Sequence, residues 1–416
     1  MKFKFLKLLT VTVVLFNGAA FSQMSSAYSR IGVGDLNYTY SAANLALGGG
    51  GVAVSEKDFI GIINPAGWDR LKLTRTEFAF GVNSVFVENG SEKGYFAKGI
   101  FSGFTMAFPA STEYGVGIVA GIVPYSTVSY KAKLKNNVSE INGRYSLNMS
   151  GNGGLSKVFL GSSFHPLKDF SIGATVEYYF GEINHASEVI FDDNSVLSSY
   201  HEDQLKPRGI GTTLGFISPD ISSLFGSSKI KDFRIGASVN LIANLNTDTM
   251  LIAHSTNAYD TLNSGTVDMK IPTRITAGIS LVVSDKYQIF ADYTTQSWKD
   301  YSLNENKASY LRALNKVTAG FTYKPIKSIG ASNFERIIWR ASAGYEQSQY
   351  IINGTGINEF FIAGGFSYPL SAENTVDIGI QYCNRGTKDS NLIKENFIRL
   401  NAGFSLGELW FFRQEK

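Results

Sequence analysis

The stretch NLALGGGGVAVSEKDFIGIINPAGWDRL, residues 44–71, holds the residues whose spacing comes nearest to known chemistry. Consecutive glycines can cradle a phosphate when Gly-x-x-x-x-Gly-Lys-Ser/Thr joins a strand to a helix. Here Lys57 follows Gly48, Gly49, Gly50 and Gly51 by too many residues, and no helical pattern comes after it. The glycine run therefore does not predict a nucleotide site, and its role has to come from the rest of the chain.

The other reactive side chains are scattered along the sequence. The four histidines form no pair at metal-ligand spacing, and the one cysteine, Cys383, can complete neither a zinc motif nor a disulfide. No serine lies in a Gly-x-Ser-x-Gly signature. The charged triplet 56–58 is read as a solvated turn. The sequence thus predicts no enzyme, no bound metal and no cofactor.

The N-terminus predicts export. Lys2, Lys4 and Lys7 precede an apolar run, and the small residues around Ser22 offer a signal-peptidase site, so residues 1–22 are expected to be a cleaved signal peptide. Without these three lysines the chain has 35 basic and 35 acidic residues, which gives a nucleic-acid partner no electrostatic support. After the leader, no window of about 20 apolar residues could form a membrane-spanning helix.

A period-two pattern runs through most of the chain. In 170–180, Ile172 and Val176 share one face, whereas Thr175 and Glu177 share the other. Such alternation predicts strands. About fourteen segments show it: 74–88, 94–109, 112–131, 139–165, 168–190, 205–217, 231–254, 264–284, 285–298, 309–325, 333–350, 356–370, 373–385 and 393–412.

The charges in these segments distinguish a membrane barrel from a periplasmic sandwich or propeller, which would also alternate. Charged residues occur singly among small polar ones. A charged side chain costs free energy where it faces lipid but little where it faces a water-filled lumen. These charged residues are Glu77, Glu177, Arg234, Asp292, Arg340, Asp377 and Arg399. No fixed repeat indicates propeller blades. The prediction is an all-β, 14-stranded antiparallel transmembrane β-barrel over 73–416, located in the bacterial outer membrane among its lipids.

The connections predict an orientation. Short turns such as 166–169 and 284–286 are expected at the periplasmic side, and the longer polar stretches Asn184–Lys206 and Thr247–Gly265 are expected to be outer loops. The segment Pro219–Lys229 is either a small helix or a loop. The last strand ends in aromatic residues at 410–412, which suits insertion by the outer-membrane assembly machinery.

Residues 23–72 precede the first strand and contain the glycine run. Their apolar side chains, such as Leu45 and Ile60, require burial, which a plain linker would not give. Glycine allows the backbone to pass close to a wall, and Pro65 fixes a turn after Asn64. Residues 23–72 are therefore predicted to be a plug (hatch) inside the lumen.

The run LALGGGGVAVSEKDFIGIINPAGW resembles the hatch of the long-chain fatty acid transporter family, the FadL-type barrels, in which a glycine-rich stretch precedes Asn-Pro-Ala and the first of fourteen strands. Over the whole chain only the order of features is similar. GGLSKVFLGSSFHPLKDFSIGATVEYYFG resembles the divergent branch common in Bacteroidota. The resemblance implies a ligand-binding hatch at Gly48–Gly51 and at Asn64, Pro65, Ala66, Gly67 and Trp68.

A side opening is expected in the third strand, GVGIVAGIVPYSTVSY. Pro124 cannot donate to the ladder, and Gly121 weakens the same strand, so this position is either a gap in the wall or a bulge. FadL-type barrels release ligand sideways through a kink in their third strand, which the resemblance places here.

Two functions follow. One is an uptake channel for small hydrophobic compounds, with an apolar pocket that includes Trp68 and a lateral exit into the membrane. The alternative is an accessory subunit of a larger outer-membrane secretion or protein-assembly complex, which would bind other outer-membrane proteins through the outer wall, for example at the small residues Ala363, Gly364 and Gly365. A generic porin is disfavoured because a hatch would block its pore.

Overall fold

The computed structural model describes residues 26–90, 92–138, 143–167, 169–192, 197–226, 229–255, 258–325, 330–332, 334–371, 373–389 and 392–408. The expected signal peptide 1–22 and the aromatic residues 410–412 lie outside these ranges. Within them, no helix has the length and hydropathy needed to cross a membrane.

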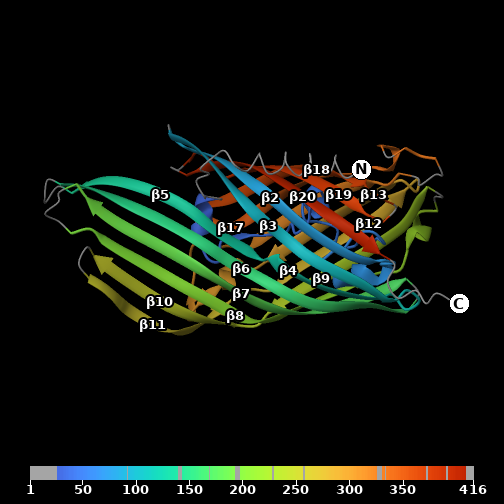
Figure 1. Cartoon of the computed structure of the whole chain (residues 1–416), viewed down its shortest axis with the longest axis horizontal. Coiled ribbons are helices and arrows are strands. Elements are labelled where there is room, and N and C mark those ends of the chain that lie inside the picture. Colours follow the sequence, from blue (N-terminus) through green and yellow to red (C-terminus); the bar gives the residue numbers. More distant parts are fainter. Residues whose placement is uncertain are drawn as a thin grey trace, which may run out of the picture.

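Fourteen antiparallel passes form a closed barrel in the described part of the chain, as the sequence predicted (Figure 1). Three passes are broken into two strands each. The wall consists of β2 (Thr74–Asn89), β3 (Glu92–Ser111), β4 (Val116–Pro124) with β5 (Ser126–Val138), β6 (Gly143–Leu167), β7 (Phe170–Phe191), β8 (Ser199–Ile217), β9 (Ile230–Ile242) with β10 (Leu245–Ser255), β11 (Ala258–Lys270) with β12 (Arg274–Val283), β13 (Tyr287–Gln296), β16 (Leu314–Tyr323), β17 (Ile338–Ile352), β18 (Thr355–Pro369), β19 (Thr375–Arg385) and β20 (Lys394–Glu408). β2 pairs with β20 from Thr74↔Glu408 onward, which closes the barrel.

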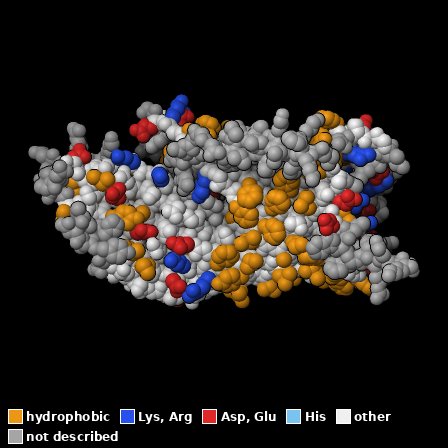
Figure 2. Space-filling model, viewed as in Figure 1, with side chains coloured by type: hydrophobic (Ala, Val, Ile, Leu, Met, Phe, Trp, Pro, Cys, Tyr) orange, Lys and Arg blue, Asp and Glu red, His pale blue; other side chains and the backbone are white. Residues whose placement is uncertain are grey.

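The period-two pattern sorts side chains between the lipid and the lumen. Val176 is 73% exposed on the outside, whereas its neighbour Glu177 is 1% exposed inside. Trp339 and Arg340 alternate in the same way, at 49% and 6%. Exposed apolar side chains form a broad patch on the part of the barrel that contains the turns (Figure 2). This patch is the wall that a bilayer would cover.

Six strands, β5–β8, β10 and β11, continue far beyond this apolar region as a projecting sheet (Figure 1). Its outer face carries exposed charges, among them Lys206 and Arg208. The predictions of long outer loops at Asn184–Lys206 and Thr247–Gly265 were therefore wrong, since most of both stretches is strand. A strand that has water on both sides can carry polar side chains on both faces. It then lacks the alternation of apolar and polar residues that identifies a lipid-facing strand.

The described N-terminal residues Ser26–Lys72, here called the plug, are threaded through the lumen and contain η1 (Ala27–Arg30), β1 (Asp35–Leu36), α2 (Ala42–Ala46) and η2 (Pro65–Arg70). Ser41 caps α2 by accepting from the Asn44 backbone N–H. The remaining short elements lie in connections: η3 (Ser222–Phe225), η4 (Trp298–Asp300), β14 (Ser302–Leu303), β15 (Asn306–Lys307) and η5 (Phe334–Arg336). The ambiguous Pro219–Lys229 stretch thus contains a 3-10 turn.

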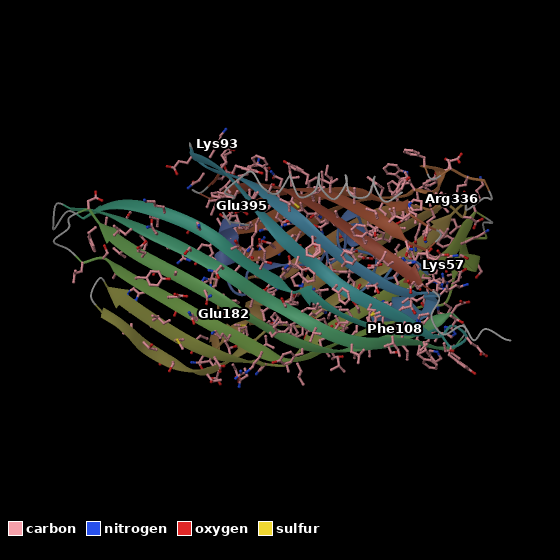
Figure 3. The ribbon with its side chains drawn as sticks, viewed as in Figure 1. Lys57, Lys93, Phe108, Glu182, Arg336 and Glu395 are labelled. Atoms are coloured by element: carbon pink, nitrogen blue, oxygen red, sulfur yellow. The ribbon has the colours of Figure 1, made fainter. Side chains whose placement is uncertain are left out.

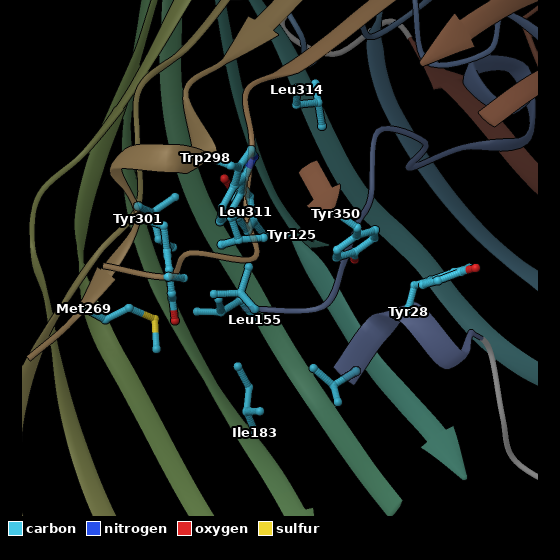
Figure 4. Close-up of a cluster of buried hydrophobic side chains, with 14 of the residues drawn as sticks. Tyr28, Tyr125, Leu155, Ile183, Met269, Trp298, Tyr301, Leu311, Leu314 and Tyr350 are labelled. Atoms are coloured by element: carbon cyan, nitrogen blue, oxygen red, sulfur yellow. The ribbon is translucent and has the colours of Figure 1, made fainter. Parts of the chain in front are cut away.

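The largest buried apolar cluster joins the plug to the wall (Figure 4). Tyr28 from the plug stacks on Tyr350 of β17 at 6.2 Å between ring centroids. Tyr125 and Leu155 come from the wall, and Trp298 comes from the connection between β13 and β16. This packing covers the lumen at the end opposite the β6–β7, β12–β13 and β18–β19 turns, which we call the loop end; the other end is the turn end.

Candidate functional site

The barrel wall is interrupted between β3 and β5. β4 pairs with β3 only from Phe104↔Ile122 to Ser111↔Val116, so residues 92–103 of β3 pair with β2 alone. Beyond Pro124, the chain keeps its ladder to β6 but turns away from β3. Gly154 on β6 permits this bend, because a Cβ there would lie 2.3 Å from the Ser126 carbonyl oxygen.

The described start of the plug occupies the open edge of β5. β1 pairs with it at Asp35↔Thr127 and Leu36↔Ser126. The Ser26 N–H donates to the Ser129 carbonyl at 3.1 Å, which extends the contact along the strand. We call residues 26–37 the closing segment, because they satisfy backbone groups that the gap would leave open.

An ion cluster ties the closing segment to the part of the wall on the β3 side of the gap. Arg385 of β19 contacts both carboxylate oxygens of Asp35 at 2.9 Å and Glu359 of β18 at 2.7 Å. Glu395 of β20 accepts from the Ser26 hydroxyl at 2.8 Å and from the Ala27 N–H at 2.6 Å. All of these wall carboxylates and the guanidinium are buried. Such paired groups hold their partners in one geometry.

Tyr28 adds a hydrogen bond to this attachment. Burial, and then the nearby Glu395 carboxylate, raise the pKa of the Tyr28 phenol to about 12. The hydroxyl therefore stays protonated at neutral pH and donates to the Ile393 carbonyl at 2.5 Å.

A cavity of about 230 Å³ lies behind the gap, bounded by the edge of β3, Pro124, the closing segment and the far wall. Its lining carries four bases and three carboxylates, together with several amides. Lys316 donates to the Gly48 carbonyl at 3.0 Å and lies 4.0 Å above the Tyr38 ring. The space behind the gap is thus lined largely by charged and polar groups.

A sequence model of the BamG family matches residues 3–416. The chain belongs to the BamG family. No match was found among curated proteins. Solved outer-membrane channels share its fold: a Pseudomonas aeruginosa FadL homologue (10% identity, 89% of this chain and 99% of that one, TM-score 0.61), the P. putida toluene transporter TodX (14%, 90% and 100%, 0.59) and the monoaromatic hydrocarbon channel CymD (16%, 89% and 98%, 0.57).

In this BamG-family chain the glycine run passes close to the wall. A Cβ on Gly48 or Gly50 would lie 2.4 Å from the ring of Phe361 or Phe290. The Val52 N–H donates to Asp292 at 3.0 Å, and Gly51 donates to the same oxygen. Gly49 lines a smaller cavity of about 70 Å³. The run therefore lies against wall side chains as a packed backbone.

Asn64 and Trp68 hold the plug together. The Asn64 amide donates to the carbonyls of Val52 and Phe216 at 2.7 and 3.0 Å, and its oxygen caps η2 at Ala66. Trp68 has 0% exposure and donates to the Gly61 carbonyl at 2.7 Å. Because none of its surface is accessible, Trp68 lies in a core and not on a pocket wall; Pro65, Ala66 and Gly67 are buried beside it.

Two further expectations are corrected by the structure. Glu56 and Asp58 form ion pairs with Lys324 and Arg75, at 3.1 and 3.3 Å, so the charged triplet is not simply a solvated turn. The small residues of β18 do not form one outer patch. A Cβ on Gly365 would face Ala46 of the plug at 2.8 Å, and Ala363 shares its side of the strand; of the three, Gly364 alone faces outward.

Sequence reasoning missed the ion cluster. Glu359 and Arg385 could have been assigned to the lumen by alternation, and they are register neighbours on β18 and β19. Nothing in the sequence pairs either of them with Asp35, which lies in an irregular segment.

Proposed function

We propose that this chain is a structural subunit of an outer-membrane protein-assembly complex, in which a FadL-type barrel has become a closed scaffold. The observation that carries the proposal is the closing segment, which fills the side gap and is held there by Arg385 through Asp35. A ligand path to the membrane would have to displace it.

The energetics favour the closed state. Moving the closing segment would separate Asp35 from Arg385, which would keep Glu359 as a partner, and would take the Ser26 and Ala27 donors from the buried Glu395 carboxylate. Losing one partner of a buried pair costs about 3–5 kcal/mol. Because about 1.4 kcal/mol corresponds to a tenfold change in population, this cost would keep the population of the open state below about 1%. The charged lining behind the gap would also have to be desolvated against an apolar ligand.

The family name supports the same proposal, since BamG shares its prefix with the β-barrel assembly machinery. The projecting sheet supports it further. Its six strands offer a large polar surface beyond the apolar wall, which a solitary small-molecule channel does not require.

Transport of small hydrophobic compounds is the second candidate, and the interrupted β3–β5 pairing favours it. The related structures include a toluene transporter and a monoaromatic hydrocarbon channel. On this alternative the closing segment would be a gate that ligand binding releases.

Native mass spectrometry separates the two candidates. The full chain would be purified in mild detergent from the outer membrane of the producing organism. A stoichiometric complex with other outer-membrane proteins, weakened in an Asp35→Asn variant but kept in the control, supports the scaffold. A lone barrel that carries a hydrophobic molecule would overturn it. Asp285→Asn is the matched control, because Asp285 pairs with Lys231 on the surface.

A further inference from the structure

A second, larger cavity lies at the turn end of the lumen, away from the ion cluster. Its volume is about 420 Å³, and it lies between the plug and the inner faces of β2, β17, β18 and β19. Arg336 marks this end of the barrel, and Glu395 lies farther toward the loop end (Figure 3). The turn end is the expected periplasmic side, so the cavity is open to periplasmic proteins.

One wall of this cavity carries arginines that lack a carboxylate partner. Arg340 is 6% exposed and donates a hydrogen bond of 2.6 Å to the Ser367 hydroxyl. Among the described residues, no carboxylate lies within ion-pair distance of Arg340 or Arg336. The buried Nε of Arg336 has no acceptor there either. A buried guanidinium normally has anionic or carbonyl partners. Arg340 and Arg336 therefore have donor groups available for an additional acceptor.

The adjoining part of the wall, on β19 and β2, presents acidic groups that are also incompletely partnered. Glu77 is 6% exposed; one of its oxygens accepts from Ser405 at 3.3 Å, and the other has no donor in the described part of the chain. Asp377, equally buried, accepts from Thr375 at 3.1 Å and from no other side chain in the described ranges. Neither Glu77 nor Asp377 lies within ion-pair distance of a base in the described ranges. Both signs of charge thus line this cavity, on strands that follow one another around the wall.

The floor of the cavity is apolar. Phe59 and Ala43 of the plug contribute to it, and Ile338 and Pro369 of the wall border it. An occupant therefore needs an apolar body as well as an anionic group for the arginine wall and a donor for the acidic wall.

We propose that this cavity binds a short segment of a partner polypeptide from the periplasmic side, with a carboxylate held by Arg340 and Arg336. The inference rests on the proposed function, because it places a partner of the assembly complex at the turn end. A polypeptide supplies all three requirements at once: acidic side chains, backbone N–H donors for Glu77 and Asp377, and apolar neighbours. A lipid-like anion would leave the two carboxylates without donors.

The carboxylate requirement can be tested with a matched pair of probes. The full chain in detergent micelles would be titrated with N-acetyl-Phe-Asp-amide and with N-acetyl-Phe-Asn-amide, and followed by saturation-transfer NMR. We expect the Asp probe to bind at least tenfold more tightly than the Asn probe. Arg340→Gln should remove most of that difference, and Lys231→Gln, at an exposed pair, should leave it intact. Equal binding of the two probes, or an unchanged preference in Arg340→Gln, overturns the proposal.

Two further measurements keep the result interpretable. Arg336→Gln is a second variant at a less buried site, for use if Arg340→Gln fails to fold, and it should weaken the Asp probe severalfold. A photo-crosslinking residue at Ser371 on the cavity rim should label a complex partner in cells, whereas one at Asp169 should not. If the native complex forms but neither Ser371 labelling nor probe preference appears, the cavity proposal fails alone. If the Asp probe binds but no complex exists, the proposed function fails instead.

Discussion

Arg385 and Asp35 are 350 positions apart in sequence, yet the guanidinium reaches both carboxylate oxygens at 2.9 Å inside the barrel. The contact joins the closing segment to β19, on the β3 side of the gap. Tyr350 also donates to Asp35, at 2.8 Å. A side opening that the backbone creates is therefore closed by a plug segment whose Asp35 charge is matched by Arg385 of β19.

Replacing Arg385 should destabilise the barrel and loosen the closing segment. Arg385→Gln removes the base that Asp35 and Glu395 contact and leaves Glu359 with the more distant Arg399, at 3.7 Å, and we expect a loss of about 3–5 kcal/mol in unfolding free energy. Denaturant unfolding in micelles measures the loss, and limited proteolysis reports on residues 26–37. Lys231→Gln should change stability by less than about 1 kcal/mol, because its pair with Asp285 is exposed. Equal effects of the two variants would contradict a structural role for Arg385.

Much of the barrel could be predicted from the sequence, because alternation is a local property. Glu177 and Arg340 lie in the lumen where the period-two pattern placed them, and the number of passes is the one counted. The same rule failed in the projecting sheet. At 184–206, where no lipid contacts the wall, the outward residues are polar as well, and a strand then reads as a loop.

The site was harder to predict, for a different physical reason. Pro124 and Gly121 carry a local signal, since proline cannot donate to a ladder. The ion cluster has no local sequence signal, because its residues come from separate segments that only barrel closure brings together. These residues are Asp35, Glu359, Arg385 and Glu395. Trp68 was given a ligand role by resemblance, but the structure buries it completely.

Gly34 should be irreplaceable in the closing segment. Its φ is +90°, and a Cβ would lie 2.4 Å from the Thr127 carbonyl oxygen. Gly34→Ala therefore clashes with backbone on β5 and should weaken β1 pairing by about 1–3 kcal/mol. Hydrogen exchange at residues 34–37 should accelerate by tenfold or more. Gly99→Ala is the control, since nothing lies within 4 Å of a Cβ there. Unchanged exchange in Gly34→Ala would show that β1 does not pair with β5 in this way.

Trp68→Ala should reduce stability without altering partner binding. Trp68 is fully buried and stacks on Phe159 at 6.4 Å, so truncation leaves a cavity and should cost about 3–5 kcal/mol. Thermal unfolding measures the cost, and native mass spectrometry measures the complex. Trp339→Ala on the outer wall should cost far less, because Trp339 is 49% exposed. Loss of the complex in a folded Trp68→Ala protein would instead assign this residue a role in recognition.

The limits of the lipid-facing wall can be mapped with single arginines. Val176 lies at the centre of the outward series Ile172–Phe180 on β7 and is 73% exposed, so Val176→Arg places a charge in the bilayer and should cost about 2–4 kcal/mol. Met250 is 40% exposed on the outer face of the projecting sheet, and Met250→Arg there should cost close to nothing. Equilibrium folding into lipid vesicles measures both changes. A penalty at Met250 as large as that at Val176 would mean that lipid also covers the projecting sheet, and its polar surface would then be unavailable to a water-exposed partner.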